Sequence, residues 1–270
     1  MSTFAFIMVG RSGGDVRRQV SYIQSGMTLG QVLGPAAGAI VAARVGFRLS
    51  FVLGAFMLWA CSALVWWGVP PGKPRDAEAG RAGGASLREL ATVSLVVLAG
   101  STQVFFLTSI LPQILPPLGV PVDSTLEVGG FLIFATGVAA SLGAMSAPRL
   151  ADLIGDRRAV LWFLLGSSLF VAALAAARGV WTFGALRFLQ VLCIAPVFPL
   201  SVAAIAQRAS GEAIGFVNSA RIGAAFLGPV LATTLLASMP PAAVYLVLAA
   251  LGLAVVPLVA RLDRAARLGR

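Results

Sequence analysis

The protein has 270 residues, of which 59% are hydrophobic and only 11% are charged, and its mean hydropathy is +0.93. Soluble domains carry about 25% charged residues, so water is not its main solvent. It contains no histidine, which excludes a histidine-based catalytic triad and a histidine zinc site. Its two cysteines, Cys61 and Cys193, fall within apolar runs and do not suggest a disulfide framework.

Apolar runs of about 20 residues, the length that crosses the hydrocarbon core of a bilayer, recur along the chain. Backbone groups in lipid must be satisfied within the segment, and the alternation typical of a barrel strand is absent, so each run is predicted to be a helix. The expected fold class is an all-α polytopic membrane protein. The eight predicted spans are residues 20–43, 48–69, 91–112, 126–148, 159–177, 181–206, 213–237 and 241–260.

Glycines recur at every fourth position in the first span. Gly26, Gly30, Gly34 and Gly38 advance only slightly around a helix and form one stripe, with Pro35 in the same run. In water these residues would destabilise a helix. In lipid, small residues let a neighbouring helix approach closely and proline bends the helix there, so a packing stripe is predicted.

A segment rich in proline, glycine and charge follows the second span. Residues 70–85, PPGKPRDAEAGRAGGA, have the composition of a flexible linker. We therefore divide the chain into residues 1–69, a cytoplasmic linker at 70–90, and residues 91–270.

Basic residues are distributed unevenly between the two sides of the membrane. If the loop before the first span is cytoplasmic, only Arg44, Arg48 and Arg178 fall in outer segments. The positive-inside rule then fixes the orientation and places the C-terminus in the cytoplasm. Because topology explains the net charge of +10, no nucleic-acid partner is expected.

The sequence contains an internal repeat. Residues 20–43 align without gaps on residues 214–237, and both copies contain Leu-Gly-Pro. Six spans separate their starts, an even number, so the copies enter the membrane in the same direction and form a parallel repeat of six-helix halves. When the alignment is extended to the amino terminus, the first residue falls midway along a helix. In a complete protein of twelve helices, the chain would thus begin within the fourth helix and contain the last eight. The equivalent of Gly34 and Pro35 is the pair Gly228 and Pro229.

Two arginines lie within spans. Arg187 begins the sequence Arg-Phe-Leu-Gln, which ends at Gln190, and Arg221 lies one turn after Asn218. A membrane-embedded arginine costs about 2.5–3.5 kcal/mol on insertion scales, so it usually faces a cavity or a partner. Arg187 is also near enough to the outer end of its span to snorkel.

The sequence resembles the major facilitator superfamily, drug-exporter type, over essentially its whole length. The run from Gly30 to Gly38 resembles the fifth-helix signature G-x-x-x-G-P-x-x-G-G, departing from it at Ala39, and Arg187 and Gln190 echo the R-x-x-Q of the fourth helix. The resemblance implies that residues 1–69 end an N-terminal six-helix bundle and that residues 91–270 form the C-terminal bundle. Most of the first four helices would then be missing. The fifth-helix signature implies export rather than import. The alternative is that its small residues only let helices pack closely and say nothing about the direction of transport.

A charged loop between the fourth and fifth spans completes the resemblance. The segment PRLADLIGDRR, residues 148–158, is similar to the cytoplasmic motif G-x-L-a-D-R-x-G-R-R, although proline replaces its first glycine and leucine its first basic residue. In the family this loop latches the inward side closed; the alternative is a solvated basic turn. The matching residues are Asp152, Gly155, Arg157 and Arg158.

Polar side chains within the spans are the candidates for a substrate cavity at the repeat interface, where such transporters bind substrate. The alternative for each amide is a hydrogen bond that holds two helices together. No acidic residue lies deep in a span, so a proton site is expected at Glu127, near the outer surface, or in the missing helices. The cavity candidates are Gln24, Gln103, Arg187, Gln190, Asn218 and Arg221.

The leading hypothesis is a multi-pass carrier of the inner (plasma) membrane that exports drugs or other amphipathic compounds in exchange for protons by alternating access. Its expected partners are the lipid bilayer, a small-molecule substrate and protons, with no cofactor or metal. The alternatives are uptake of a metabolite such as a sugar or an organic anion, bound by Arg187 or Arg221, and a truncated fragment that does not transport. No enzyme activity is expected, because histidine and a buried carboxylate pair are absent.

Overall fold

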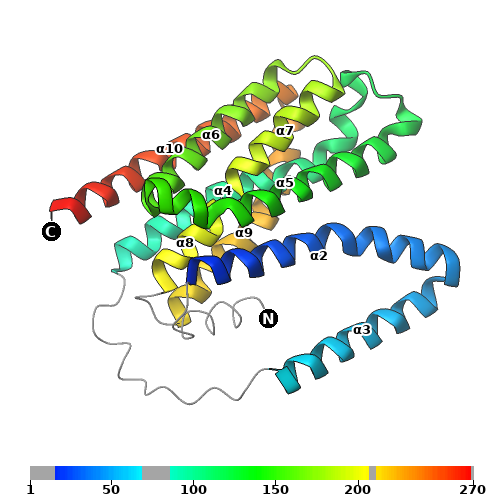
Figure 1. Ribbon diagram of the computed structural model, residues 1–270. Helices are drawn as coiled ribbons and strands as arrows, with labels where there is room; N and C mark the ends of the chain where they lie inside the picture. Colours follow the sequence, from blue (N-terminus) through cyan, green and yellow to red (C-terminus); the bar gives the residue numbers. More distant parts are fainter. Residues whose placement is uncertain (1–15, 69–85, 207–210, 269–270) are drawn as a thin grey trace.

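The computed structural model describes residues 16–68, 86–206 and 211–268, and in these ranges it is helical without a strand (Figure 1). This confirms the predicted all-α fold. Short 3-10 helices, η2 (Pro116–Leu118), η3 (Val122–Ser124) and η4 (Leu174–Ala176), lie in the connections. The α-helices are α2 (Val16–Val45), α3 (Phe47–Gly68), α4 (Leu87–Ile114), α5 (Thr125–Ile154), α6 (Asp156–Ala173), α7 (Val180–Ile194), α8 (Val197–Ala206), α9 (Gly211–Leu236) and α10 (Pro241–Leu268).

Seven segments among the described residues are long and apolar enough to cross a membrane. They correspond to seven of the eight predicted spans. The remaining one, residues 20–43, lies in α2, a helix of 30 residues that is less hydrophobic than the others and is not among the seven. The chain is therefore a multi-pass membrane protein in which the glycine-rich helix α2 is the least apolar member.

The predicted span at residues 181–206 is a single crossing made of two helices. α7 ends at Ile194 and α8 begins at Val197, with Ala195 and Pro196 as a turn between them. Proline has no backbone N–H to donate and its ring clashes with the preceding turn, so the helix breaks there. The expectation of one continuous helix is corrected at this point.

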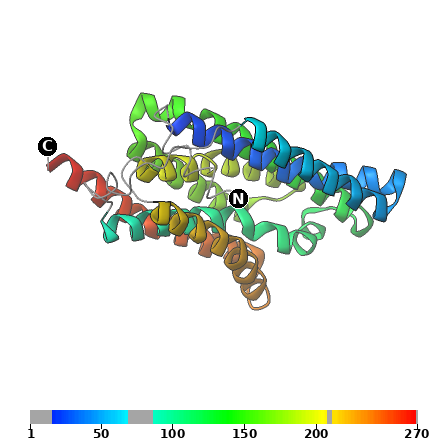
Figure 2. The ribbon, with the colours of Figure 1, turned by 90° about the horizontal axis from the view of Figure 1, so that it is seen from below.

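The hairpin of α2 and α3 lies along the side of the molecule opposite the C-terminal helix α10 (Figures 1 and 2). α2 packs against α5 and α8, and the Ser25 hydroxyl donates a hydrogen bond to the Ser141 carbonyl on α5 at 3.3 Å. α3 is instead exposed along almost its whole length; Trp66 and Trp67 are 84% and 86% exposed. The connection to the remaining helices thus runs through α2.

The expected linker at 70–90 lies mostly outside the described residues. Its last part is helical, because α4 begins at Leu87. The Ser86 side chain accepts a hydrogen bond from the Glu89 N–H at 3.2 Å. Ser86 and Glu89 have the spacing of a capping box, a sequence signal for a helix start that the apolar run alone does not reveal.

The two copies of the glycine-proline repeat have different surroundings. Gly228 lies against α4, where a Cβ atom would come within 3.2 Å of the Phe106 nitrogen and the Thr102 oxygen. A Cβ atom at Gly26, Gly30 or Gly34 on α2 would instead meet nothing within 4 Å. Within the described residues, close packing is thus found at the second copy. The surroundings of Pro35 and Gly38 lie outside the described part.

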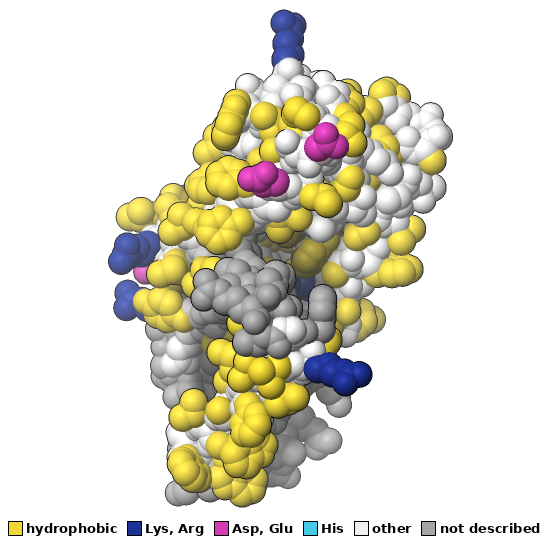
Figure 3. Space-filling view, turned by 90° about the vertical axis from the view of Figure 1, so that its right-hand side faces the viewer, with side chains coloured by type: hydrophobic (Ala, Val, Ile, Leu, Met, Phe, Trp, Pro, Cys, Tyr) yellow, Lys and Arg dark blue, Asp and Glu magenta, His cyan; other side chains and the backbone are white. Residues whose placement is uncertain are grey.

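The core of the larger helix group contains an aromatic cluster. Phe106, Phe183 and Tyr245 come from α4, α7 and α10, and the Tyr245 ring centroid lies 6.2 Å from that of Phe106 and 6.1 Å from that of Phe183. Many large apolar side chains face outward, as expected where lipid is the solvent. Hydrophobic side chains cover much of the face in Figure 3, and charged groups are few there.

Candidate functional site

Arg187 lies in the interior of the helix group, only 3% exposed. Its Nη1 donates hydrogen bonds to the Gln103 carbonyl at 2.8 Å and to Gln190 Oε1, and its Nη2 donates to the Val104 carbonyl at 2.6 Å. The guanidinium also lies over the Phe106 ring, 5.1 Å from its centroid. Arg187 thus ties α7 to α4.

The Gln103 and Gln190 side chains extend this network to other helices. Gln190 Nε2 donates to Ser167 Oγ at 2.8 Å, and Ser167 Oγ donates to Gln103 Oε1 at 2.7 Å. Gln103 Nε2 donates to Ser168 Oγ at 3.0 Å and to the Leu248 carbonyl on α10 at 3.3 Å. The network therefore joins α4, α6, α7 and α10, and buried polar groups paired in this way are stable in an apolar interior.

Gly252 on α10 provides the space for this network. A Cβ atom there would overlap Gln103 Nε2 and Ser168 Oγ. The absence of a side chain at this position lets the amide and the hydroxyl approach the α10 backbone.

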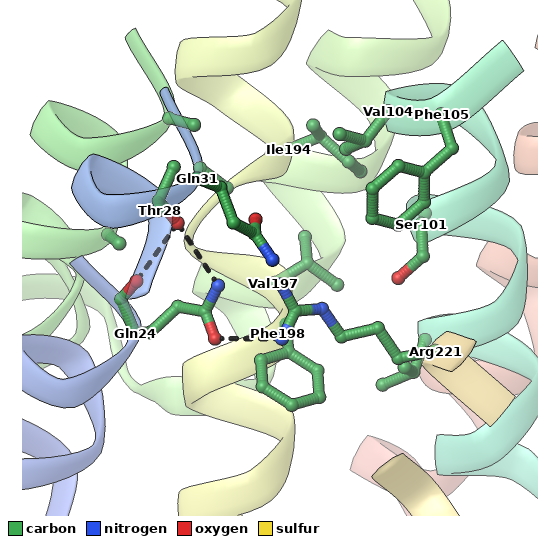
Figure 4. A pocket seen from close by; sticks show the side chains of 15 residues that line it. Gln24, Thr28, Gln31, Ser101, Val104, Phe105, Ile194, Val197, Phe198 and Arg221 are labelled. Carbon is green, nitrogen blue, oxygen red and sulfur yellow. Dashed lines mark hydrogen bonds between the residues drawn. The ribbon is translucent and has the colours of Figure 1, made fainter. Parts of the chain in front are cut away.

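A second arginine connects α2 to the larger helix group. Arg221 on α9 donates from Nη1 to Gln24 Oε1 at 3.1 Å, and its guanidinium lies 4.6 Å from the centroid of the Phe198 ring. Gln24 Nε2 donates to Thr28 Oγ1 at 3.3 Å, one turn further along α2. Figure 4 shows Gln24, Thr28 and Gln31 on one side of a cavity, with Arg221 reaching toward them from the other.

Two cavities lie between α2 and the helices that face it. The first has a volume of about 80 Å³ and is lined by Gln24 and Arg221, among others. The second, of about 170 Å³, reaches Arg187. None of the described residues that line them is acidic. Their shared lining residues are Thr28, Gln31, Val104, Phe105 and Ala140, so the cavities are adjacent.

The structure separates the six predicted cavity residues into groups. Gln24 and Arg221 line the first cavity and Arg187 lines the second. Gln103 and Gln190 line neither cavity and bond helices to one another. Asn218 is 3% exposed on α9 and also lines neither.

Sequence reasoning missed several residues that line the cavities. Thr28 and Gln31 follow Gln24 by four and seven positions, which places all three on one face of a helix. This spacing was the available signal. Ser101 and Phe105 on α4 show no comparable spacing, because apolar and small side chains occur on several faces of that helix.

The loop motif lies where α5 ends and α6 begins. Gly155 has a φ of +87°, a left-handed conformation that favours glycine, and its N–H donates to the Ala151 carbonyl at 2.8 Å. Asp152 precedes this turn in α5, and Arg157 and Arg158 follow it in α6. Arg157 Nη2 forms an ion pair with Glu89 Oε1 at 3.9 Å, which links the start of α6 to the start of α4.

A larger groove of about 830 Å³ lies between α5 and α7. Glu127, the acidic residue considered as a proton site, is exposed in the first turn of α5 and lines this groove together with Trp181, which is 80% exposed. The groove is distinct from the two cavities that border α2, apart from the shared contact at Leu132.

Long apolar helices around a buried polar network, with cavities between helix groups, are typical of polytopic membrane carriers. The family comparison agrees: residues 93–269 match the Major Facilitator Superfamily, and the chain belongs to this family. Its members are transport proteins rather than enzymes. The predicted resemblance is thereby confirmed.

Two bacterial proteins illustrate the similarity of this chain to its relatives, at sequence identities of 27% and 25%. An uncharacterised MFS-type transporter, YuxJ of Bacillus subtilis, is 27% identical over 218 residues, which are 77% of this chain and 55% of the relative. The multidrug resistance protein MdtG of Dickeya zeae is 25% identical over 243 residues, 84% of this chain and 58% of MdtG. The chain thus spans a little over half the length of these relatives.

Among solved structures, the human organic anion transporter MFSD10 (TETRAN) has a similar fold. The TM-score is 0.71 at 17% sequence identity, and the match covers 96% of this chain and 67% of that one. This similarity extends to α2 and α3, which precede the residues matched by the family comparison.

Proposed function

We propose that this chain takes part in the export of amphipathic small molecules across the plasma membrane by alternating access. The observation that carries the proposal is the pair of cavities between α2 and the larger helix group, with Gln24 and Arg221 in contact across the first. Carriers with parallel repeats bind substrate at the interface between the repeats. The glycine-proline motif of α2 and the similarity to MdtG support export over uptake.

In this proposal the cavities open and close as α2 moves relative to α9. The contact between Gln24 and Arg221 is a hydrogen bond to a neutral amide rather than an ion pair, so water or a ligand that offers another acceptor to Arg221 can replace it. The hydrophobic contacts at Val20, which packs with residues of α4, α8 and α9, hold the first turns of α2, one turn before Gln24, so the movement is larger toward the other end of the helix. The loop around Gly155 is proposed as the cytoplasmic latch, and the C-terminus is placed in the cytoplasm.

We also propose that protons drive the exchange. The cavity-lining residues that the structure describes include no acidic one, so Glu127 in the groove between α5 and α7 is the proposed proton-binding residue of the described chain. A carboxylate near the membrane surface can take up and release protons as its hydration changes.

An efflux assay tests the export proposal. The protein is expressed in a bacterial host that lacks its own efflux pumps, and the cellular retention of ethidium, a cation, and of fluorescein, an anion, is measured by fluorescence. Lower retention of either dye than in the empty-vector control supports export, and equal or higher retention of both dyes contradicts it. A matched pair of variants on α9 locates the effect: Arg221→Gln should reduce export, whereas Ser219→Ala, which alters an exposed hydroxyl bonded to its own helix, should not.

Uptake is the second candidate function, favoured by the two arginines that line the cavities. Counterflow in membrane vesicles separates it from export, because an uptake carrier accumulates labelled substrate when vesicles are preloaded with the unlabelled compound. If neither assay shows transport by a correctly inserted protein, the alternative of a non-transporting fragment is supported.

A further inference from the structure

We propose that Arg221 is an anion-recognising residue and that the transported substrates are amphipathic organic anions, whose charged group displaces Gln24 from Arg221. This inference rests on the proposed transport function and names its substrate class. It starts from a difference between the two arginines that line the cavities.

Arg221 has more unused hydrogen-bonding capacity than Arg187, which donates three hydrogen bonds from Nη1 and Nη2 but whose buried Nε has no partner among the described residues. A guanidinium carries five N–H donors. Among the described residues, Arg221 has one acceptor, Gln24 Oε1, while Arg187 donates to two carbonyls and to Gln190. Spare donors of a charged group within a membrane span require an acceptor, either water or a ligand. Because Arg221 has the greater spare capacity and is half-buried, whereas Arg187 is 3% exposed, Arg221 is the arginine that a ligand can reach more readily.

The charge of the cavities favours an anion over a cation. In the part of the chain that the structure describes, two arginines and no acidic residue line them, and neither arginine forms an ion pair with an acidic side chain. A carboxylate, sulfonate or phosphate group can accept two parallel hydrogen bonds from a guanidinium, which a neutral amide oxygen cannot. Such a group would compete effectively with the single bond that Gln24 accepts.

Apolar and amide groups surround the guanidinium in a way that suits an amphipathic molecule. Phe105 and Val104 line both cavities and offer an apolar surface. Gln31, also shared by both cavities, can donate an additional hydrogen bond from its amide (Figure 4). An anionic group at Arg221 would thus place an attached ring against these apolar side chains.

The size of the cavities links binding to the separation of the helices. Volumes of about 80 and 170 Å³ are smaller than the roughly 300–1,000 Å³ of typical ligand pockets. A complete amphipathic molecule therefore fits only when α2 moves away from α9. Because the anion takes the place of Gln24 on Arg221, it removes the hydrogen bond that opposes this movement.

The experiment compares an anionic and a cationic aromatic dye. The full chain, purified and reconstituted into phosphatidylcholine vesicles without anionic lipid, is assayed for transport of fluorescein and of ethidium. The variants are Arg221→Gln, Arg221→Lys and Gln24→Glu, with Ser219→Ala as the matched control on α9. Circular dichroism and gel filtration of each variant verify that it is folded.

Each variant has a defined expected result. Arg221→Gln should lower the ratio of fluorescein to ethidium transport by about tenfold or more, as expected for the loss of hydrogen bonds to a charged group. Gln24→Glu should lower the same ratio, because the new carboxylate occupies Arg221 from within the protein. Arg221→Lys should retain part of the preference, since it keeps the charge but loses the two-pronged geometry.

Two results would overturn the proposal. One is an unchanged dye ratio in folded Arg221→Gln and Gln24→Glu; the other is an equal fall in transport of both dyes, which would assign Arg221 a structural role. Wild-type protein that transports ethidium but not fluorescein would reject the anion preference and leave the proposed transport function intact. Wild-type protein that transports neither dye would instead contradict the transport function itself.

Discussion

Arg221 on α9 donates a hydrogen bond to Gln24 on α2 across 3.1 Å, and these residues belong to the two copies of the internal repeat. In the sequence alignment Gln24 is equivalent to Asn218, which lies one turn before Arg221. The repeat-related helices are thus connected at nearly equivalent positions, beside the cavities that both helices border. Arg221 donates one such hydrogen bond to a neutral acceptor, whereas Arg187 donates three.

Gly252→Ala should disrupt the buried network around Gln103. The added methyl group would overlap Gln103 Nε2 and Ser168 Oγ, so at least one buried polar group must lose its partner. We expect a loss of about 1–3 kcal/mol in the free energy of unfolding, measured as a lower midpoint of unfolding in detergent. Gly130→Ala is the control, because a Cβ atom at this α5 position meets nothing within 4 Å. An unchanged midpoint for Gly252→Ala would contradict the network geometry.

Gln190→Leu should be more destabilising than Arg187→Met. The first change removes an acceptor from Arg187 and leaves the buried guanidinium and Ser167 with fewer partners. The second removes the charge itself, and replacing a buried charged group by an apolar one is often tolerated. The double variant should be less destabilised than the sum of the two single changes, because no charge remains to be satisfied. Additive effects would show that these side chains do not act as one network.

Gly228→Val should destabilise the packing of α4 against α9. Its Cβ atom would approach the α4 backbone at Thr102 and Phe106 to 3.2 Å, and backbone atoms cannot move aside as a flexible side chain can. Overpacking of this kind costs about 1–3 kcal/mol. The same substitution at Gly30 on α2, where nothing lies within 4 Å, should cost less. Thermal unfolding of the two variants in detergent compares them, and a larger loss at Gly30 would contradict this arrangement.

The ion pair between Arg157 and Glu89 should contribute little to stability. Its atoms are 3.9 Å apart and the two side chains are 33% and 26% exposed, so water and salt screen the attraction. A double-mutant cycle with Arg157→Gln and Glu89→Gln should give a coupling of about 0.2–1 kcal/mol, which falls as salt is added. A larger coupling that is insensitive to salt would instead support a tightly closed latch at this loop.

The sequence by itself determined which segments are helices that cross the membrane. Lipid leaves the backbone no partner outside its own helix, so hydrophobic length alone located seven crossings correctly. The start of α4 at Leu87 and the break at Pro196 were also encoded locally, by a capping box and by a proline, although apolar length did not reveal them.

Only the tertiary structure decided what each polar or small residue does within its helix. Gln24 and Gln103 are both glutamines in apolar runs, yet one borders a cavity and the other is enclosed in a hydrogen-bond network. Gly34 and Gly228 are equivalent in the repeat, yet of the two only Gly228 has a neighbouring backbone within 4 Å of a Cβ position. The physical reason is that hydropathy and spacing describe a helix alone, whereas the role of a side chain depends on which helix faces it.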